Sequence, residues 1–448
     1  MRIVCTLCLL AVSVLTFGQA SDSAKTILTF EEAVKIGLNR NVLLNQQKNQ
    51  LVAVEAQRLN SIGNFIPNIN LQGGWTHQSG NQQNSTTGDL ENIDTDQVNA
   101  QLNAGVTLFN GGRTINTLFQ ANSQVLSQSY LIKRGTQDVV SFVASQYLLV
   151  LQDQELLKIA EQNQTTQQTL KDQMQGFVDV GQRAMTDVYN QDALLKAAQV
   201  TAIRARSTLQ NDKAALAQLL QLDPSQDFEV VYPEFRAELI DYSKLSLDSL
   251  INIAVENRPD LKQFRHQVEA NKFGKRVAFS NYVPSITLFA GYGSFYYSLI
   301  PESFNQQFRT LNPSMSYGAN ITIPIFTRFQ PRYQRALARV TYDNSVLNED
   351  NLYKTVKIDV QKAHNNLINA TEAYYASLAQ FQAGELALQI QKESYDLGVS
   401  AQVAVAQANQ TYVSGAASRV QAEVTLLFQK ILLEYALGTL TVDDYVRQ

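Results

Sequence analysis

Residues 28–34 read LTFEEAV, and residues 245–251 read LSLDSLI, a weaker copy of the same pattern 217 positions further on. The same offset aligns PNINL at 67–71 with PSITL at 284–288. The register needs no gap along about 195 residues, and a register this constant is the signature of a repeated structural unit. The sequence therefore predicts a tandem duplication, which decides the architecture.

The duplication divides the chain into four parts. Residues 1–20 combine Arg2 with an apolar run and a small-residue cleavage site, the pattern of a secretory signal peptide. A first repeat then occupies 21–223, a linker 224–244 and a second repeat 245–448. Both cysteines lie inside the signal peptide, so the mature protein would have no disulfide. The mature sequence has no apolar run long enough to predict a transmembrane helix.

Long helices are predicted in each repeat. Prolines are absent from 68–223 and from 332–448, which permits uninterrupted helices there. Apolar side chains recur every seven residues along 360–395, and this spacing is typical of a left-handed coiled coil. A helix of about 60 residues would be about 90 Å long, which is too long for a compact domain. We therefore expect helical hairpins that turn near Gly181 and Gly398.

Two segments of each repeat alternate between apolar and polar residues, as in VNAQLNAGVTL at 98–108. Alternation over about ten residues predicts strands that can cross a bilayer, apolar outside and polar inside. The expected strands are about 65–76, 98–109, 283–296 and 315–326, joined by exposed loops at 77–97 and 297–314. The polar side chains expected to line the lumen are Asn68, Asn70, Gln72, Asn99, Gln101, Asn103, Asn320 and Thr322.

Four strands cannot close a barrel, so a chain with four spanning strands must share a barrel with copies of itself. Trp75 and Tyr292 fall on outward strand positions, where they would form part of an interfacial aromatic girdle. Two alternatives stay open. The strands of a soluble sandwich also alternate, although they are usually shorter. A secreted coiled-coil structural protein, such as a flagellin-like subunit, would share the Gln-rich and Asn-rich composition.

Composition argues against other classes of function. The net charge of −4 and the absence of a basic run argue against nucleic acid as a partner. The three histidines are far apart in sequence, which leaves little for a histidine metal site or a catalytic triad. The mature sequence also has no thiol and no glycine-rich phosphate loop. We expect no enzymatic activity, no cofactor and no bound metal.

The signal peptide, the duplicated halves, the paired strands and the long hairpins together resemble the TolC-like outer membrane efflux protein family. The most specific matching segments are LTFEEA at 28–33, NRPDL at 257–261, VGQRAMTDV at 180–188 and YDLGVSA at 395–401. In the first repeat, the Pro-Asp-Leu part of this signature is degraded to NVL at 41–43. This departure affects a helix start and leaves the assignment unchanged.

The resemblance implies a mainly α fold with β structure. Duplicated coiled-coil hairpins would form an α-barrel, and four strands per chain would contribute to a shared trimeric 12-stranded transmembrane β-barrel. Such a homotrimer would span the outer membrane, contact its lipid and extend into the periplasm. It would be the exit duct of a tripartite efflux pump, docked through a periplasmic adaptor (membrane fusion) protein onto an inner membrane pump or ABC exporter. Type I protein secretion stays an alternative, and the lack of Met, Cys or His clusters favours drugs over metal ions as cargo.

The same resemblance implies that the hairpin tips contain the gate and the residues that dock the adaptor. Thr186, Asp187 and Tyr395 would form the periplasmic gate, with the Asp187 carboxylate and the Tyr395 hydroxyl as a hydrogen-bonded pair. Alternatively, Asp187 caps its helix and Tyr395 belongs to the coiled-coil seam. Ala404 and Gln407 stand where some relatives carry aspartates, which argues against an acidic cation-binding ring. The residues expected to dock the adaptor are Val180, Gly181, Gln182, Arg183, Leu397, Gly398, Val399 and Ser400.

Overall fold

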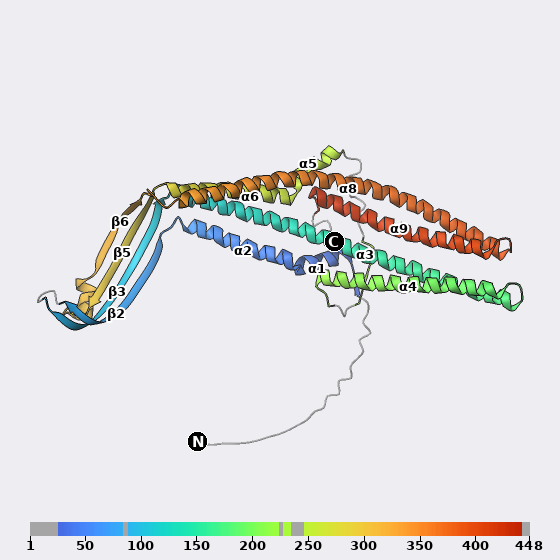
Figure 1. Ribbon diagram of the computed structural model, residues 1–448, viewed down its shortest axis with the longest axis horizontal. Coiled ribbons are helices and arrows are strands. Elements are labelled where there is room, and N and C mark those ends of the chain that lie inside the picture. The colour runs from blue at the N-terminus through green and yellow to red at the C-terminus, as the bar shows by residue number, and fades with distance from the viewer. Residues whose placement is uncertain (1–25, 84–87, 224–226, 234–245, 441–448) are drawn as a thin grey trace, which may run out of the picture.

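The computed structural model describes residues 26–83, 88–223, 227–233 and 246–440. The molecule is elongated, with a four-stranded sheet at one end and long helices that extend away from it (Figure 1). The predicted signal peptide lies outside the described residues, as does most of the predicted linker. No helix within the described part of the chain is long and apolar enough to cross a membrane.

Both repeats contain two helices, two long strands and two longer helices, in the same order. In the first, α1 (Phe30–Arg40) and α2 (Val42–Gly63) precede β2 (Asn68–Gln83), β3 (Leu90–Phe109), α3 (Arg113–Asp179) and α4 (Met185–Leu220). In the second, α5 (Leu247–Asn257) and α6 (Pro259–Phe279) precede β5 (Ser285–Tyr297), β6 (Ser314–Thr322), α8 (Gln330–Asp396) and α9 (Gln402–Leu437). Helices α3 and α8 both have 67 residues, and α4 and α9 both have 36. The two halves therefore have matching helix lengths.

The segment LTFEEAV contains a helix start. The backbone N–H of Glu32 donates to the Thr29 hydroxyl at 3.3 Å, and the Thr29 N–H donates to the Glu32 carboxylate at 3.2 Å. This reciprocal capping box satisfies N–H groups that the first helical turn leaves without a partner. At the equivalent position of the second repeat, Ser246 accepts a hydrogen bond from the Ser249 N–H at 3.3 Å. The two copies therefore start their first helices at the same place.

The four long strands form one antiparallel sheet in the order β2-β3-β5-β6, so the β3–β5 pairing joins the two repeats. A separate parallel pair joins β1 (Thr26–Leu28) to β4 (Phe228–Val230), which belongs to the linker. The buried Tyr147 hydroxyl lies 2.9 Å from the Leu28 carbonyl oxygen and accepts a hydrogen bond from the Val231 N–H at 3.1 Å. Tyr147 thus fixes the start of the chain and the linker to α3.

The strand ends differ from those expected. The predicted loop at 77–97 is mostly strand, since β2 continues to Gln83 and β3 begins at Leu90. This extension shows no apolar alternation because most of its side chains on both faces are exposed. The predicted loop at 297–314 contains the short α7 (Phe304–Gln306) and a π-helical turn, η3 (Gln307–Leu311). Strand β6 ends at Thr322, four residues before the predicted end at 326. Pro324 follows, and proline has no N–H to donate to a neighbouring strand.

Buried apolar side chains from both repeats hold the helices together. One cluster joins α1, α3, α4 and α9 and includes Val34, Leu148 and Leu216. A second cluster joins α5, α8 and α9 and includes Leu250 and Leu433. Helix α9 contributes to both clusters and therefore links the cores of the two repeats.

Candidate functional site

The polar residues predicted for the lumen share one face of the sheet. The register places Asn70 opposite Asn103 and Gln72 opposite Gln101, and residues directly opposite each other in a sheet point to the same face. Asn68 and Asn99 lie two residues from these positions along β2 and β3, so they point the same way. We call this surface the amide face.

The amide face continues across β5 to β6. Thr287 pairs with Thr107 on one side and with Asn320 on the other, and Thr322 lies two residues beyond Asn320. Glycine makes room for the amides in the middle of the sheet, where a β-carbon at Gly291 would lie 3.2 Å from Asn103 Oδ1. All eight predicted lumen residues therefore lie on one face, which is polar and carries no formal charge at those positions.

The opposite face of the sheet is apolar and exposed. Leu71 and Trp75 on β2 are 74% and 68% exposed, and Tyr317 and Ile321 on β6 are 78% and 66% exposed. A soluble monomer rarely exposes a contiguous apolar surface of this extent, because each buried methylene would be worth about 0.8 kcal/mol. This face is therefore built for contact with lipid or with another protein.

The aromatic residues predicted for a girdle lie on this apolar face. The Trp75 indole N–H donates to Asp96 Oδ1 at 3.1 Å, and His77 Nδ1 lies 3.0 Å from the same oxygen. Trp75 thus turns its polar edge toward the long β2–β3 extension. Tyr292 is opposite Leu102, four strand positions nearer the helices, and is 56% exposed.

A second group of aromatic side chains lies where the sheet meets the helices, and sequence reasoning missed it. The rings of Phe279 and Tyr282 lie 6.1 Å apart, and those of Phe326 and Phe329 lie 5.7 Å apart. All four side chains are exposed. In both pairs the aromatic residues are three positions apart at a strand–helix junction, a spacing that could have revealed them. The sheet therefore has aromatic residues at both ends.

The two hairpin tips lie at the end of the molecule opposite the sheet (Figure 1). Gly181 and Gly398 have φ of 72° and 75°, in the left-handed region that glycine adopts without strain. The N–H of the next residue, Gln182 or Val399, donates to the carbonyl five positions back at 2.9 Å in both tips. This is a Schellman motif, which ends α3 and α8 in the same way.

The predicted gate residues lie beside these tips. Tyr395 packs with Met174, Val188 and Val405 in a small apolar cluster, and the Arg183 guanidinium lies 5.8 Å from the centre of its ring. Burial raises the pKa of the Tyr395 hydroxyl. This hydroxyl has no hydrogen-bond partner among the described residues.

The expected bond between the Asp187 carboxylate and the Tyr395 hydroxyl is therefore not formed within the chain. Asp187 is half-buried in the first turn of α4, and Thr186 is exposed beside it. The docking residues predicted at the first tip, from Val180 to Arg183, are exposed. At the second tip, Leu397 to Val399 are exposed, and Ser400 is half-buried and donates to Gln391 Oε1 at 2.8 Å.

A chain of amide hydrogen bonds joins the two hairpins a short distance from the tips. Gln402 donates to Gln191 at 2.7 Å, and Gln191 donates to Gln167 at 2.7 Å. Asn163 accepts from Gln167 at 3.4 Å and from Asn409 at 2.8 Å. We call these five residues the amide ladder. Sequence reasoning missed it because its partners lie as far as 246 residues apart and show no local pattern.

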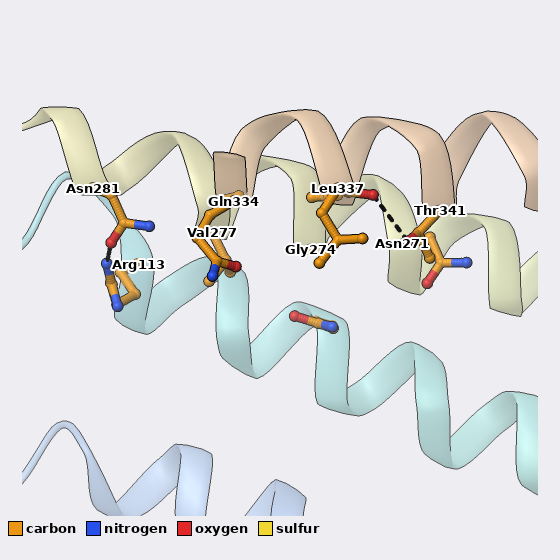
Figure 2. A pocket seen from close by; sticks show the side chains of 11 residues that line it. Arg113, Asn271, Gly274, Val277, Asn281, Gln334, Leu337 and Thr341 are labelled. Atoms are coloured by element: carbon orange, nitrogen blue, oxygen red, sulfur yellow. Dashed lines mark hydrogen bonds between the residues drawn. The ribbon is translucent and has the colours of Figure 1, made fainter. Parts of the chain in front are cut away.

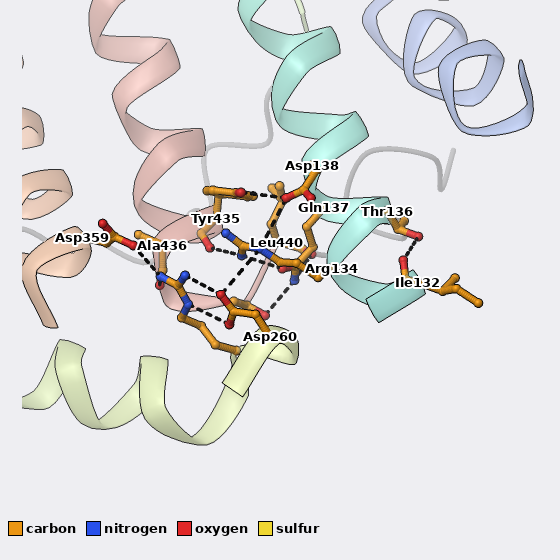
Figure 3. Close-up of polar contacts among 12 residues, drawn as sticks. Ile132, Arg134, Thr136, Gln137, Asp138, Asp260, Asp359, Tyr435, Ala436 and Leu440 are labelled. Carbon is orange, nitrogen blue, oxygen red and sulfur yellow. Dashed lines mark hydrogen bonds and ion pairs between the residues drawn. The ribbon is translucent and has the colours of Figure 1, made fainter. Parts of the chain in front are cut away.

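A charged cluster holds four helices together (Figure 3). Arg258, at the start of α6, is 3% exposed and lies 2.6 Å from Asp260 and 3.3 Å from Asp359 of α8. Arg134 of α3 lies 4.0 Å from Asp260 and stacks on the Tyr435 ring of α9 at 3.7 Å. Burial alone would raise the pKa of Asp260, but the Arg258 guanidinium holds it below the usual range. We call this group the Arg258 clamp.

A groove of about 470 Å³ lies between α3, α6 and α8 near the sheet (Figure 2). Its walls mix amides such as Gln120 and Asn271 with apolar side chains such as Val277 and Leu337. Arg113 points across one end of the groove to Asn281 and also donates to Ser280 at 3.2 Å. Within the described residues, no group of three or more His, Cys, Asp or Glu side chains is arranged to hold a metal ion.

Comparison with known proteins identifies the class of this chain. The sequence pattern of the family described as outer membrane efflux protein matches residues 34–221 and 250–439. The chain belongs to the outer membrane efflux protein family. It is therefore an outer membrane efflux channel with a TolC-like fold, of the kind that works in tripartite pumps. Channels of this class form trimers and work with pump partners.

Individual relatives of this efflux channel agree with the family assignment. It is 23% identical to outer membrane protein TolC of Vibrio cholerae over 417 residues, which cover 90% of this chain and 91% of TolC. Its fold matches the CmeC channel of Campylobacter jejuni with a TM-score of 0.79, at 16% identity over 92% of this chain and 85% of CmeC. The open MtrE channel of Neisseria gonorrhoeae matches with a TM-score of 0.76, at 19% identity over 92% and 91% of the two chains. These relatives are channel proteins rather than enzymes.

Proposed function

We propose that three copies of this chain form a shared 12-stranded barrel and a continuous duct, which conducts small molecules such as drugs passively from the periplasm to the exterior. The observation that carries this proposal is the sheet itself, with an amide face on one side and an exposed apolar face on the other. The outer strands β2 and β6 each pair along one edge only within the described residues. Pairing β6 of one copy with β2 of the next would satisfy these edges.

The length of the sheet suits this role. On β3, Trp75 lies opposite Val98, and the strand ends at the helix side with Phe109, an exposed aromatic residue. The eleven steps from residue 98 to residue 109 extend about 36 Å at ~3.3 Å each. With the tilt of about 40° that barrel strands adopt, this gives about 28 Å along the membrane normal. That height is close to the apolar band of an outer membrane barrel, about 25 Å.

The chemistry of the amide face favours an unselective duct. Asparagine and glutamine side chains hydrate the lumen without the charge rings that select ions. The tips would then receive the rest of the pump, namely a periplasmic adaptor that connects the channel to an inner membrane transporter. The exposed tip segments at 180–183 and 397–399 offer backbone and side-chain groups for this docking.

The tips would also form the periplasmic gate, with Thr186, Asp187 and Tyr395 as its residues. In a trimer, three copies of each tip would converge on the axis. The unpartnered Tyr395 hydroxyl and the half-buried Asp187 carboxylate would there find partners on neighbouring copies. Docking of the adaptor would separate the tips and open the duct.

Purification in detergent tests the assembly directly. We expect a protein mass near 150 kDa, about three chains of 49.9 kDa, and single channels of small conductance in planar bilayers. A water-soluble monomer without channel activity would overturn the proposal. Complementation of a strain that lacks its own exit duct then separates cargo classes. Restored drug resistance supports efflux, and restored protein export alone would favour type I secretion.

Substitutions at the tips test the gate separately. Asp187→Ala and Tyr395→Phe should raise the single-channel conductance of the closed trimer, because each removes one side of a link that holds the tips together. Tyr189→Phe is the matched control. Tyr189 lies in α4, the helix that contains Asp187, and its side chain is 66% exposed. If the protein is a trimer whose conductance is unchanged by Asp187→Ala and Tyr395→Phe, the proposed duct stands and these two residues are not part of the gate.

A further inference from the structure

Arginines form a stripe at the start of α8, next to the sheet. Arg332, Arg335 and Arg339 follow one another at intervals of three and four residues, which places them on one side of the helix. Arg328 precedes the helix by two residues, and all four arginines are exposed. Residues 326–342 contain no acidic residue. We call these four residues the arginine stripe.

The first three arginines of the stripe are free to bind an external anion. Arg328, Arg332 and Arg335 make no ion pair within the described part of the chain. The Arg335 guanidinium lies 5.6 Å from the centre of the ring of Phe279, one of the exposed aromatic residues at the strand–helix junction. Arg339 differs, because its Nε atom lies 3.5 Å from a carboxylate oxygen of Asp343.

Helix α6 adds positive charge beside the stripe. Residues 270–283 contain three cationic residues and no acidic residue. Lys272 and Arg276 are exposed, and the Lys275 ammonium lies 3.9 Å from the centre of the Tyr342 ring of α8. The part of α6 and α8 nearest the sheet is therefore strongly basic, although the whole chain has a net charge of −4.

The first repeat lacks the stripe. At the offset of 217 residues, Arg328 and Phe329 correspond to Gly111 and Gly112. The glycines have φ of 68° and 77°, and Arg328 and Phe329 have φ of 50° and 61°. Only glycine adopts this region without strain, so the turn itself does not explain why an arginine stands at 328. The other stripe positions correspond to Ile115, Leu118 and Asn122.

The arginine stripe and the groove lie on opposite sides of α8. Leu337 lines the groove and is two residues away from both Arg335 and Arg339. Two residues of an α-helix correspond to a rotation of about 200°, so these arginines point away from the groove.

The groove lies on the same side of the molecule as the amide face. Tyr297 of β5 points to the amide face, because it lies opposite Gln97, two residues from Asn99. Gln307, which precedes β6, binds the N–H and the carbonyl of Tyr297 at 3.1 and 3.2 Å, so the peptide groups of amide-face residues in β5 point toward β6. When a strand of L-residues runs from right to left with these side chains toward the viewer, their peptide groups point upward, and β6 lies above β5. Figure 2 looks onto the groove with the sheet to the left, beyond Arg113, and α8 lies above α6 in the same sense. The arginine stripe therefore lies on the side of the molecule that carries the apolar face.

We propose that the arginine stripe binds the phosphate groups of anionic phospholipids in the periplasmic leaflet of the outer membrane. The inference rests on the proposed barrel, in which the apolar face contacts lipid and the helices leave the membrane at the strand–helix junction. The guanidinium fork matches the oxygens of a phosphate group, and the exposed aromatic rings beside it suit the boundary between acyl chains and headgroups. Helix α8 also begins without a side-chain cap, so its positive end is open to an anion.

The stripe has the length that a headgroup layer requires. Arg328 and Arg335 are seven residues apart, about 10 Å at ~1.5 Å per residue. The headgroup layer on one side of a bilayer is about 5–8 Å thick, and arginine side chains can extend toward it from either side. Arg339 lies further from the sheet and already has Asp343 as its partner. The binding residues are therefore Arg328, Arg332 and Arg335.

Native mass spectrometry of the full protein in detergent tests this assignment. With phosphatidylglycerol and phosphatidylcholine of equal chain length added at equal concentration, the protein should retain phosphatidylglycerol preferentially, and added salt should weaken the preference. Arg328→Gln/Arg332→Gln/Arg335→Gln should reduce the retention of phosphatidylglycerol at least about tenfold. Lys158→Gln/Lys362→Gln/Lys430→Gln is the matched control, because it removes three charges from exposed lysines of α3, α8 and α9 outside the stripe.

A single substitution separates lipid binding from folding. Arg328→Gly gives the second repeat the residue that the first has at 111, and it relieves the strain of a positive φ. The unfolding temperature should stay equal or rise, while the retention of phosphatidylglycerol falls. A purely structural role of Arg328 predicts the opposite, a lower unfolding temperature with unchanged lipid retention. This variant decides the question even if the triple variant fails to fold.

The same preparations distinguish this proposal from the proposed duct. A conducting trimer that retains both lipids equally, or whose preference survives the triple substitution, would overturn the lipid site and leave the duct intact. A triple variant with altered ion selectivity and unchanged lipid retention would place the stripe in the lumen and would also overturn the proposal. A monomer that still prefers phosphatidylglycerol would support the lipid site and reject the shared barrel.

Discussion

The two repeats have the same helix lengths but hold their first two helices in place with different chemistry. In the first repeat, the Asn41 side chain accepts a hydrogen bond from the Leu44 N–H at 2.9 Å and caps α2, and Arg40 donates to the Gln221 carbonyl at 2.9 Å. In the second repeat, the residue equivalent to Asn41 is Arg258, which is buried among carboxylates. A neutral cap and a charged clamp therefore produce the same junction.

The interiors of the hairpins differ in the same way. Gln191 and Gln167 of the amide ladder correspond to Ala408 and Gly384 in the second repeat. Helices α8 and α9 approach each other closely at Gly384. A β-carbon added there would lie 3.3 Å from the Tyr412 Cα atom. The duplication has thus preserved lengths, turns and strand parity while the contacts between helices diverged. The divergence makes each repeat a control for the other.

The largest difference should appear at the two junctions. Arg258→Met leaves Asp260 buried without its main partner, and we expect a loss of about 3–5 kcal/mol in the free energy of unfolding. Asn41→Ala removes only a helix cap and should cost about 1 kcal/mol. Denaturant titration followed by circular dichroism measures both.

The double variant Arg258→Met/Asp260→Leu sharpens this test. It should recover part of the loss, because the buried Asp260 carboxylate is removed together with Arg258, and Asp359, the other carboxylate beside Arg258, has a side chain 41% exposed that water can solvate. Arg134 keeps a partner in this variant, since its Nε atom also lies 3.3 Å from Asp138. Equal losses for Arg258→Met and Asn41→Ala would contradict the distinction between a clamp and a cap.

A residue exchange between the hairpins should have the next largest effect. Gly384→Gln places the residue of the first hairpin into the second, where the Tyr412 backbone leaves no space for it. We expect a loss of up to about 3 kcal/mol, because overpacking forces helices apart. Gly176→Gln is a suitable control, since a β-carbon at Gly176 would meet no atom within 4 Å. If the two variants unfold at the same denaturant concentration, the close approach of α8 and α9 has no energetic role.

The reverse exchange should cost less. Gln191→Ala gives the first hairpin the residue that the second has at 408. It removes the donor to the Gln167 side-chain oxygen and the acceptor of the Gln402 amide. A buried polar group without a partner costs about 2 kcal/mol. Gln389→Ala, which removes one exposed bond to Glu393, should change the stability by less than about 0.5 kcal/mol. Unfolding in denaturant distinguishes them, and equal midpoints would mean that water replaces the ladder at no cost.

The features of the fold that depend on local periodicity could be predicted from the sequence. Strand parity follows from alternation, and the turns follow from Gly181 and Gly398, so the amide face and the tips could be found before the fold was known. The contacts between distant segments could not be found in this way. Gln191 resembles an ordinary surface residue of a helix, and only packing against Gln167 and Gln402 makes it part of a network.

The motif around Arg258 could be predicted only in part from the sequence. Its sequence signature marked the helix start, because proline after Arg258 favours the first turn of a helix. The partners of Arg258 on α8 and α9 come from positions 101 and 178 residues away, which no local pattern relates to it. The strand ends were missed for another reason. Alternation requires one apolar face, and the extension of β2 and β3 beyond residue 76 has none.

The smallest effect should occur where the repeats are alike. Gly181→Ala and Gly398→Ala should each cost about 1 kcal/mol, because alanine in the left-handed region is strained and no atom lies within 4 Å of either β-carbon. Gly438→Ala combines the same strain at φ 73° with a β-carbon only 2.6 Å from the Arg258 Cα atom, so it should cost more. Denaturant titration of each variant measures these losses of stability. Unequal losses for Gly181→Ala and Gly398→Ala would mean that contacts beyond the turn itself stabilise one of the two tips. The two hairpins would then not be equivalent at their tips.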